Sequence, residues 1–190
     1  PRMPFCRYAD DGLIHCRSLR QAQYLREKIA QRLKECALEL HPEKTRVVYC
    51  KDIHRQQEYE TIQFDFLGYT FRPRRSKDRY GRLFTNFTPA IARAAIISLR
   101  QEVRGWRLQL KSDKSIEDLA RIFNPVIAGW VNYYCRFHPS AFDRVGGHIN
   151  WVLAKWAMRK YKTLRGHKRR SRKWVAHVAK QRPNLFVHWR

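Results

Sequence analysis

The chain has 190 residues, 44% of them hydrophobic and 29% charged, which is the composition of a globular protein with one ordinary domain or two small ones. No stretch approaches the roughly 18 apolar residues of a membrane span, and the arginine-containing first 20 residues do not resemble a signal peptide. Forty Lys and Arg against 16 Asp and Glu give a net charge of +24, which argues against an enzyme of small neutral substrates and favours a polyanionic partner. Five cysteines, without a C-x-x-C pair, favour a reducing compartment over a zinc knuckle or a disulfide scaffold.

The charge is distributed unevenly along the chain. Residues 1–71 carry 12 Lys and Arg against 10 Asp and Glu, a net charge of +2, whereas residues 72–190 carry 28 against 6, a net charge of +22. No acidic residue follows Asp143. We therefore expect an ordinary fold with chemistry in the first third and a binding surface in the rest.

The first third alternates β-prone runs with one amphipathic helix. Residues 5–16 predict a hairpin around Ala-Asp-Asp-Gly, in which Gly12 supplies the conformational freedom of the turn. Ser18 caps a helix whose apolar stripe continues to Leu40, before Pro42 stops it. Residues 46–50 then predict a strand, and residues 64–71 a second hairpin or a strand bent at Gly68.

Beyond residue 71 the pattern is first basic and then helical. Residues 72–79 predict a basic loop, and residues 80–87 a further strand. Thr88 and Pro89 are typical of a helix start, so we expect a helix to about residue 110. Ser115 and Asp118 resemble a capping box, with Pro125 expected to kink or restart the helix that they open. Residues 140–161 and 168–180 predict two more helices, which makes the chain α+β.

The sequence Tyr8-Ala9-Asp10-Asp11 is the clearest chemical signal. Adjacent carboxylates at a hairpin tip repel each other unless a divalent cation neutralises them, and two-metal phosphoryl transfer uses such oxygen ligands. The alternative is an ordinary Asp-Asp-Gly surface turn.

The order of the motifs resembles a group II intron reverse transcriptase/maturase. Residues 5–18 are similar to the catalytic block around the Tyr-x-Asp-Asp motif of that family, residues 38–45 to the next palm block, and residues 64–69 to the block that bears the primer grip. Residues 122–134 (IFNPVIAGWVNYY) resemble the core of the maturase-specific domain, which serves as thumb and RNA-binding module, and residues 151–159 and 186–189 fit the same domain.

The resemblance implies an α+β architecture in three parts. Residues 1–71 are the C-terminal part of a reverse-transcriptase palm, residues 72–88 a basic linker or strand, and residues 89–190 a mostly helical maturase-specific (thumb) domain. The family's palm has a further metal-binding aspartate, and fingers, upstream of the catalytic block. Only seven residues precede Tyr8, so we expect this chain to be a C-terminal piece that is inactive as a polymerase by itself.

The family's roles transfer to matching residues as follows. Asp10 and Asp11 would bind Mg²⁺ in a two-metal site that the upstream aspartate completes, and Lys44 would stabilise or protonate the leaving pyrophosphate. Tyr8 and Ala9 would support the incoming nucleotide. Phe66, Leu67 and Gly68 would form the primer grip; the alternative for Phe66 and Leu67 is core packing.

The C-terminal part interleaves aromatic and basic residues, as structured-RNA binders do. The predicted RNA-binding residues are Arg72, Arg74, Arg75, Asn132, Arg136, Arg159, Lys160, Arg165, Lys168, Arg169, Arg170, Arg172 and Lys173. The alternative for residues 165–173 is a disordered basic tail or a nuclear localisation patch. Helical spacing predicts that Val126, Trp130, Tyr133 and Tyr134 face inward, and core packing is favoured over RNA stacking for Trp130, Trp151 and Trp156.

The implied function is that of an intron-encoded RNA-directed DNA polymerase and maturase in the bacterial cytoplasm or an organelle. Its partners would be intron RNA, an RNA template with a DNA primer, and dNTPs, with no membrane; the sequence gives no indication of an oligomeric state. The alternative is a non-catalytic RNA-binding splicing factor, or a degenerate remnant that kept the thumb. A reverse transcriptase of defence or diversity generation is disfavoured by residues 124–130.

Overall fold

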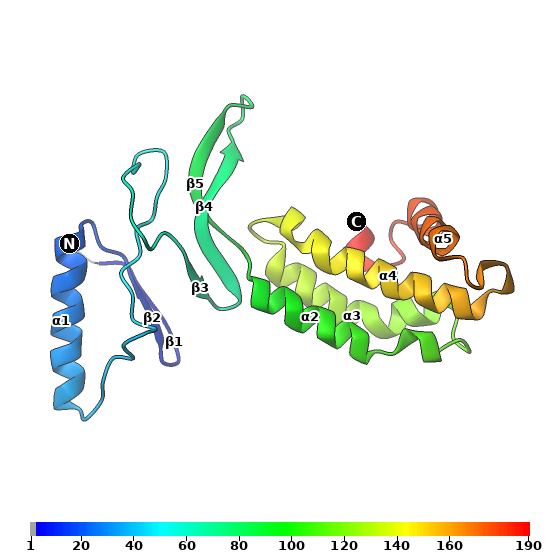
Figure 1. Cartoon of the computed structure of the whole chain (residues 1–190), viewed down its shortest axis with the longest axis horizontal. Coiled ribbons are helices and arrows are strands. Elements are labelled where there is room, and N and C mark those ends of the chain that lie inside the picture. Colours follow the sequence, from blue (N-terminus) through cyan, green and yellow to red (C-terminus); the bar gives the residue numbers. More distant parts are fainter. Residues whose placement is uncertain (1–2) are drawn as a thin grey trace. The chain divides into compact units, whose positions relative to one another are not determined.

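The computed structural model describes residues 3–190, which form two compact units (Figure 1). The first comprises the described residues up to Tyr49 together with Glu58–Ile62, and the second comprises Cys50–Gln57 and Gln63–Arg190. Strands and helices occur together, so the predicted α+β class is confirmed. Among the described residues, no helix combines the length and the apolar character needed to cross a bilayer.

The first unit contains the predicted hairpin. Strands β1 (Phe5–Tyr8) and β2 (Asp11–Ile14) are antiparallel, with Tyr8 opposite Asp11, so Ala9 and Asp10 form a two-residue turn. The role predicted for Gly12 is wrong, because this glycine lies inside β2, opposite Arg7. The left-handed backbone of the turn falls instead on Ala9, with φ of 50°.

Helix α1 (Leu19–Glu35) starts as predicted, since the Ser18 side chain accepts a hydrogen bond from the Gln21 N–H at 3.2 Å. It ends five residues earlier than predicted. Ala37 adopts φ of 55°, its N–H donates to the Lys34 carbonyl, and the next N–H donates to the Leu33 carbonyl. This is a Schellman ending, which closes the helix with an alanine where glycine is usual.

The strand predicted over residues 46–50 is wrong, because that stretch has irregular backbone. It is held locally: the Tyr49 N–H donates to the Thr61 carbonyl at 2.9 Å, and the Tyr49 and Tyr59 rings stack at 4.4 Å.

The second unit begins with an antiparallel sheet of strand order β3-β4-β5: Phe64–Phe66, Tyr69–Lys77 and Leu83–Ile91. The predicted second hairpin is confirmed, and its turn residues Leu67 and Gly68 both have positive φ, of 49° and 75°. This is the geometry that matches the twist of a two-residue hairpin.

Two predictions for residues 72–92 are wrong. The basic loop is the outer half of β4, and the helix start at Thr88 and Pro89 is the end of β5. Thr88 pairs with Arg72 and Pro89 with Phe71, so the aromatic and β-branched residues of this stretch pair with β4 and override the local helix-start signal.

Four helices complete the second unit: α2 (Arg93–Gly105), α3 (Ile116–Tyr134), α4 (Asp143–Lys160) and α5 (Lys168–Gln181). Short 3₁₀ turns lie at Leu108–Leu110, Pro139–Phe142, Lys162–Leu164 and Val187–Trp189. The capping box of Ser115 and Asp118 is confirmed, and α3 continues through Pro125 without a restart. Helix α4 starts after a 3₁₀ turn rather than at Ser140, whereas α5 matches its prediction to within a residue.

The core is built mainly from α3 and α4. Trp156 is fully buried and its indole N–H donates to the Lys111 carbonyl at 2.9 Å, as the core prediction required. Trp130 is partly buried and stacks on Trp106 at 5.6 Å. The inward assignment is wrong for Val126 and Tyr133, which are 38% and 46% exposed. The stripe that packs inward runs instead through Ile116, Leu119, Ala120, Phe123 and Ile127 to Trp130 and Tyr134.

Two asparagines hold the C-terminal segment against the helices. The Asn124 side chain donates to the Leu185 carbonyl at 2.9 Å and accepts from the Val187 N–H at 3.2 Å. The Asn150 carbonyl oxygen accepts from the indole of Trp189 at 2.7 Å and lies 2.9 Å from His188 Nε2. Since that oxygen is an acceptor, His188 Nε2 carries the proton.

We predict that the stability of the second unit falls as the pH is lowered from 7 to 4. Burial lowers the pKa of His188 to about 4, from the unperturbed 6.5. The folded state therefore binds fewer protons than the unfolded state, so the stabilisation is complete above pH 6.5 and is lost as the pH falls toward 4. At its steepest the loss is about 1.4 kcal/mol per pH unit, measurable by urea unfolding.

His188→Gln keeps a donor toward Asn150 but does not titrate, so it should flatten this pH profile. His177→Gln, which changes an exposed residue of α5, is the control and should leave the profile unchanged. Equal profiles for the wild type and His188→Gln would contradict the prediction.

Candidate nucleic-acid interface

The two adjacent carboxylates lie at the exposed tip of the β1–β2 hairpin. Asp10 occupies the turn and Asp11 begins β2, and within the described part of the chain neither side chain makes an ion pair or a hydrogen bond. Tyr8, the neighbouring candidate, is 62% exposed. Lys44 is exposed in a turn of the same unit, where its N–H lies 3.4 Å from His41 Nδ1, and it has no ion pair with either aspartate.

The two carboxylates at this tip are of the ligand type that Mg²⁺ prefers. Carboxylate oxygens are the hard ligands that Mg²⁺ takes in phosphoryl-transfer sites, and these two are accessible to solvent. In the described range, no group of three or more His, Cys, Asp or Glu side chains comes together. The hairpin therefore offers two carboxylates, and a metal ion bound here would need further ligands.

The predicted primer grip is fixed to the end of helix α3. The Tyr133 hydroxyl donates to the Leu67 carbonyl at 2.8 Å, and the Tyr69 hydroxyl donates to the Tyr133 carbonyl. The Gly68 carbonyl accepts from the Ala92 N–H at 2.8 Å. A Cβ at Gly68 would lie 3.0 Å from the Tyr134 hydroxyl, so glycine is needed here for close approach as well as for its positive φ.

Aromatic contacts strengthen this junction. The Tyr69 ring packs against Tyr133, Tyr134 and Phe137 with ring centroids 5.3 to 5.7 Å apart. Burial raises the pKa of Tyr69 and of Tyr134, so both hydroxyls stay protonated and can donate at neutral pH. The candidate grip and the α3 residues around Asn132 thus belong to one packed cluster, although Asn132 itself is exposed.

Strands β4 and β5 extend as a two-stranded ribbon past the end of β3. Arg72 and Arg75 are exposed and, being three residues apart on a strand, lie on opposite faces. Arg74 is half-buried and donates to the Thr70 and Thr88 carbonyls at 3.2 Å. Burial and the nearby Arg72 lower the pKa of Arg74. The outer ribbon therefore offers Arg72 and Arg75 to a ligand, whereas Arg74 holds its two strands together.

Sequence reasoning missed the tip of this ribbon. Tyr80 is 68% exposed, with the guanidinium groups of Arg79 and Arg82 at 4.7 and 5.5 Å from its ring centroid. Asp78 orders the turn by accepting from the N–H groups of Tyr80 and Arg82 and by pairing with the Arg82 guanidinium at 2.8 Å. This site could have been recognised from the Arg-Tyr-Gly-Arg sequence of residues 79–82, because such a sequence between two strands places an aromatic ring and two cations at a hairpin tip.

The helices bring together some of the other predicted RNA-binding residues. Arg159, Arg165 and Lys168 line one cavity of about 560 Å³. Arg172 lines a second, of about 530 Å³. Two predicted residues are engaged within the chain, since Lys160 donates to the Ser112 and Lys114 carbonyls at 3.0 and 2.7 Å, and Arg170 to Thr163. The other predicted RNA-binding residues on the helical part, Arg136, Arg169 and Lys173, are exposed.

Comparison with protein families assigns both parts of the chain. Residues 2–71 match the family described as reverse transcriptase (RNA-dependent DNA polymerase), and residues 96–174 match the group II intron, maturase-specific domain. The chain belongs to the group II intron reverse transcriptase/maturase family. Comparison with curated proteins and with solved structures gave no match.

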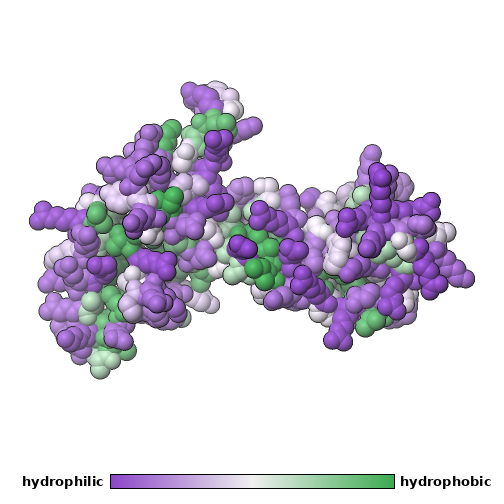
Figure 2. Space-filling model, viewed as in Figure 1, coloured by the Kyte–Doolittle hydropathy of each residue, from purple (hydrophilic) through white to green (hydrophobic). Residues whose placement is uncertain are grey.

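The maturase-specific part has an electrostatic feature that suits a polyanion. Helix α5 begins with Lys168, Arg169 and Arg170, has no acidic residue in its first turn and has no side-chain cap. Cations at a helix N-terminus oppose the helix dipole, so a bound phosphate would relieve this repulsion. Figure 2 shows hydrophilic residues over most of the visible surface of the helices, with only small apolar patches between them.

We predict that Gly68→Ala destabilises the second unit by roughly 2–3 kcal/mol, because alanine meets both the positive φ and the Tyr134 hydroxyl. Gly81→Ala is the matched control. Gly81 has φ of 80° but open space around its Cβ position, so only the backbone cost of about 1–2 kcal/mol applies. Urea unfolding measures both variants.

Adding Tyr134→Phe to Gly68→Ala removes the crowding hydroxyl and should recover part of the loss. If Gly68→Ala and Gly81→Ala lower the free energy of unfolding equally, the close approach to Tyr134 contributes nothing to the cost of the Gly68 substitution.

Proposed function

We propose that this protein binds group II intron RNA, assists splicing of the intron and supports cDNA synthesis for intron mobility. The observation that carries the proposal is the net charge of +22 beyond residue 71. Most of its basic side chains have no acidic partner among the described residues, and they lie on the ribbon and on the helices of the maturase-specific domain. Unpaired Lys and Arg bind phosphates and release counterions, which is the dominant source of affinity for nucleic acids.

We propose a separate role for the β1–β2 hairpin. Asp10 and Asp11 would bind Mg²⁺ together with a further carboxylate, with Tyr8 and Ala9 beside the incoming dNTP and Lys44 near its pyrophosphate. Bound Mg²⁺ would neutralise the charge that develops on the transferred phosphate. The grip residues Phe66, Leu67 and Gly68 would hold the DNA primer on its RNA template. The accessible pair of carboxylates and the family match of residues 2–71 support this assignment.

A second candidate is a splicing factor that binds intron RNA without catalysis. It is favoured by the fact that only two carboxylates meet at the hairpin, with no third metal-ligating side chain grouped with them in the part of the chain that the structure describes. The two candidates differ in cDNA synthesis and agree in RNA binding.

RNA affinity should depend steeply on salt. If about 6–10 basic side chains meet phosphates, the affinity for structured intron RNA falls by roughly three to five decades between 50 and 200 mM salt. Neutralising Arg169, Arg170, Arg172 and Lys173 together should reduce the slope of log K against log salt by about 3–4. Filter binding or fluorescence anisotropy over a salt series measures the slope.

The matched control neutralises four exposed basic residues of α1, namely Arg20, Arg26, Lys28 and Lys34. It removes the same charge from the part of the chain that is nearly neutral overall. A flat salt dependence of the wild type, or equal slopes for the two quadruple variants, would count against the proposed binding surface.

In an intron ribonucleoprotein whose reverse transcriptase includes the further palm aspartate, Asp10→Ala or Asp11→Ala should abolish cDNA synthesis and leave splicing assistance intact. Phosphoryl transfer to dNTPs needs the carboxylates, whereas splicing uses the catalytic metals of the RNA and needs only binding. Primer extension and splicing assays on the same preparations measure the two activities.

Glu39→Ala removes an exposed carboxylate elsewhere in the first unit and should affect neither activity. Loss of both activities in the aspartate variants, with RNA affinity intact, would show that the two functions are not separable at this hairpin. If the wild type that includes the further palm aspartate assists splicing without making cDNA, the non-catalytic candidate is favoured.

A further inference from the structure

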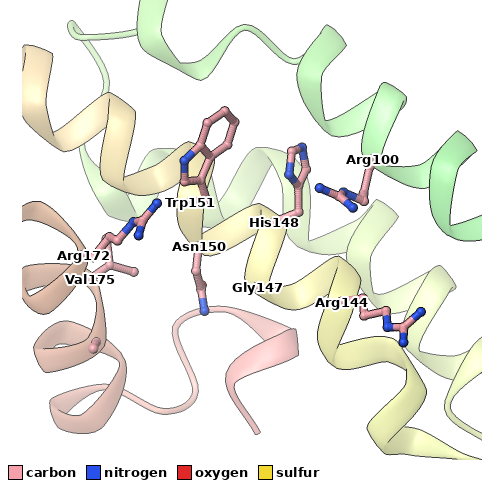
Figure 3. Close-up of a pocket in the computed structure, with 9 residues that line it drawn as sticks. Arg100, Arg144, Gly147, His148, Asn150, Trp151, Arg172 and Val175 are labelled. Carbon is pink, nitrogen blue, oxygen red and sulfur yellow. The ribbon is translucent and has the colours of Figure 1, made fainter. Parts of the chain in front are cut away.

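A cavity of about 530 Å³ lies among helices α2, α4 and α5 (Figure 3). Each helix contributes one arginine to its wall: Arg100 from α2, Arg144 from α4 and Arg172 from α5. His148, Asn150 and Trp151 complete the polar and aromatic part of the lining, and no acidic residue lines the cavity. Its volume is within the range of small-molecule sites.

The three guanidinium groups have no counter-charge. None of them makes an ion pair or a side-chain hydrogen bond within residues 3–190, and the Nε of Arg100 is buried without a partner. Like charges brought to one cavity repel each other, and a buried donor without an acceptor costs free energy. An anionic ligand would remove both penalties.

His148 supplies an independent indication of a ligand. Its side chain is 93% buried, it lines the cavity, and its Nε2 has no hydrogen-bond partner. Burial, with the nearby Arg100 and Arg104, lowers the pKa of His148, while a hydrogen bond to the Arg100 backbone opposes that shift. The imidazole is therefore neutral at pH 7 and carries one N–H group, which donates to the Arg100 backbone. The other ring nitrogen, Nε2, is then an acceptor without a donor.

Trp151 adds a further donor to the cavity, and the Lys155 ammonium lies over its ring, 3.7 Å from the centroid. Its indole stacks on the His148 ring at 5.3 Å, and its N–H donates to no acceptor in the described residues. Figure 3 shows the Arg172 guanidinium pointing toward Trp151, and that of Arg100 pointing toward His148. The cavity thus has anion-binding donors at both ends and a buried acceptor between them.

We propose that this cavity binds one unpaired nucleotide of RNA, with its phosphates on the arginines and an N–H group of its base donating to His148 Nε2. A phosphate matches guanidinium and indole donors. The Watson–Crick edge of every base carries an N–H group, and that edge is free only when the base is unpaired. The inference rests on the proposed RNA-binding function and specifies which RNA element the α2–α4–α5 face recognises.

The test compares two RNA probes of equal phosphate count, a short single strand and a fully paired hairpin, by fluorescence anisotropy at one salt concentration. Arg100→Gln and Arg144→Gln should each weaken single-strand binding about tenfold, the effect of losing one charge-assisted contact. Binding of the paired hairpin should change only as much as it does for Arg93→Gln. That control removes the same charge from an exposed position of α2 outside the cavity.

His148→Phe distinguishes a ligand-binding role from a structural one. Phenylalanine keeps the ring stack on Trp151 and removes the unpartnered buried nitrogen. This variant should therefore lose about tenfold in single-strand affinity, and its melting temperature reports separately the loss of the hydrogen bond to the Arg100 backbone. A lower melting temperature with unchanged RNA affinity would show that His148 is a structural residue and would overturn the proposal.

The outcomes separate this inference from the general proposal. If all variants and Arg93→Gln weaken both probes equally, the chain binds RNA through distributed charge and the nucleotide site is excluded. If the wild type binds neither the single strand nor the paired hairpin, the proposed RNA-binding function itself fails. If single-stranded DNA binds as tightly as single-stranded RNA, and the variants lose affinity for both to the same extent, the cavity binds a nucleotide but does not select RNA.

Discussion

The arrangement of the second unit depends on a reciprocal pair of tyrosine hydrogen bonds. The Tyr69 hydroxyl at the start of β4 donates to the Tyr133 carbonyl, and the Tyr133 hydroxyl returns a bond to the Leu67 carbonyl at 2.8 Å. The two bonds join a hairpin to the last turn of a helix 64 to 66 residues further along the chain. Because Tyr69 is 93% buried, water competes little for its bond, and the direction in which the ribbon leaves the helices is fixed.

Features decided by neighbouring residues could be predicted from sequence. The caps at Ser18 and Ser115, the turn at Gly68 and the extent of α5 all depend on contacts within a few residues. Pairing between distant segments could not be predicted in this way. Thr88 and Pro89 carry the local chemistry of a helix start, yet they form a strand because β4 supplies partners for them.

The same distinction holds for the candidate sites. A contiguous sequence motif identified Asp10 and Asp11. Counting basic residues, by contrast, could not distinguish side chains that are available to a ligand from those that hydrogen-bond within the chain. Lys160 and Arg74 satisfy backbone carbonyls, and only the fold reveals it. The meeting of Arg100, Arg144 and His148 depends on how α2 packs against α4, for which the sequence carries no local signal.

The ribbon of β4 and β5 has a consequence for self-association. Beyond Phe71 both of its edges lack a further strand in the described residues, and such edges normally invite another chain to add a strand. Each strand carries a proline, Pro73 and Pro89, whose missing N–H interrupts the row of donors that an added strand would need. Arg72, Arg75 and Lys77 repel a second copy of the same ribbon. Neutralising these cations to study nucleic-acid contacts would therefore also weaken a safeguard against edge-to-edge aggregation.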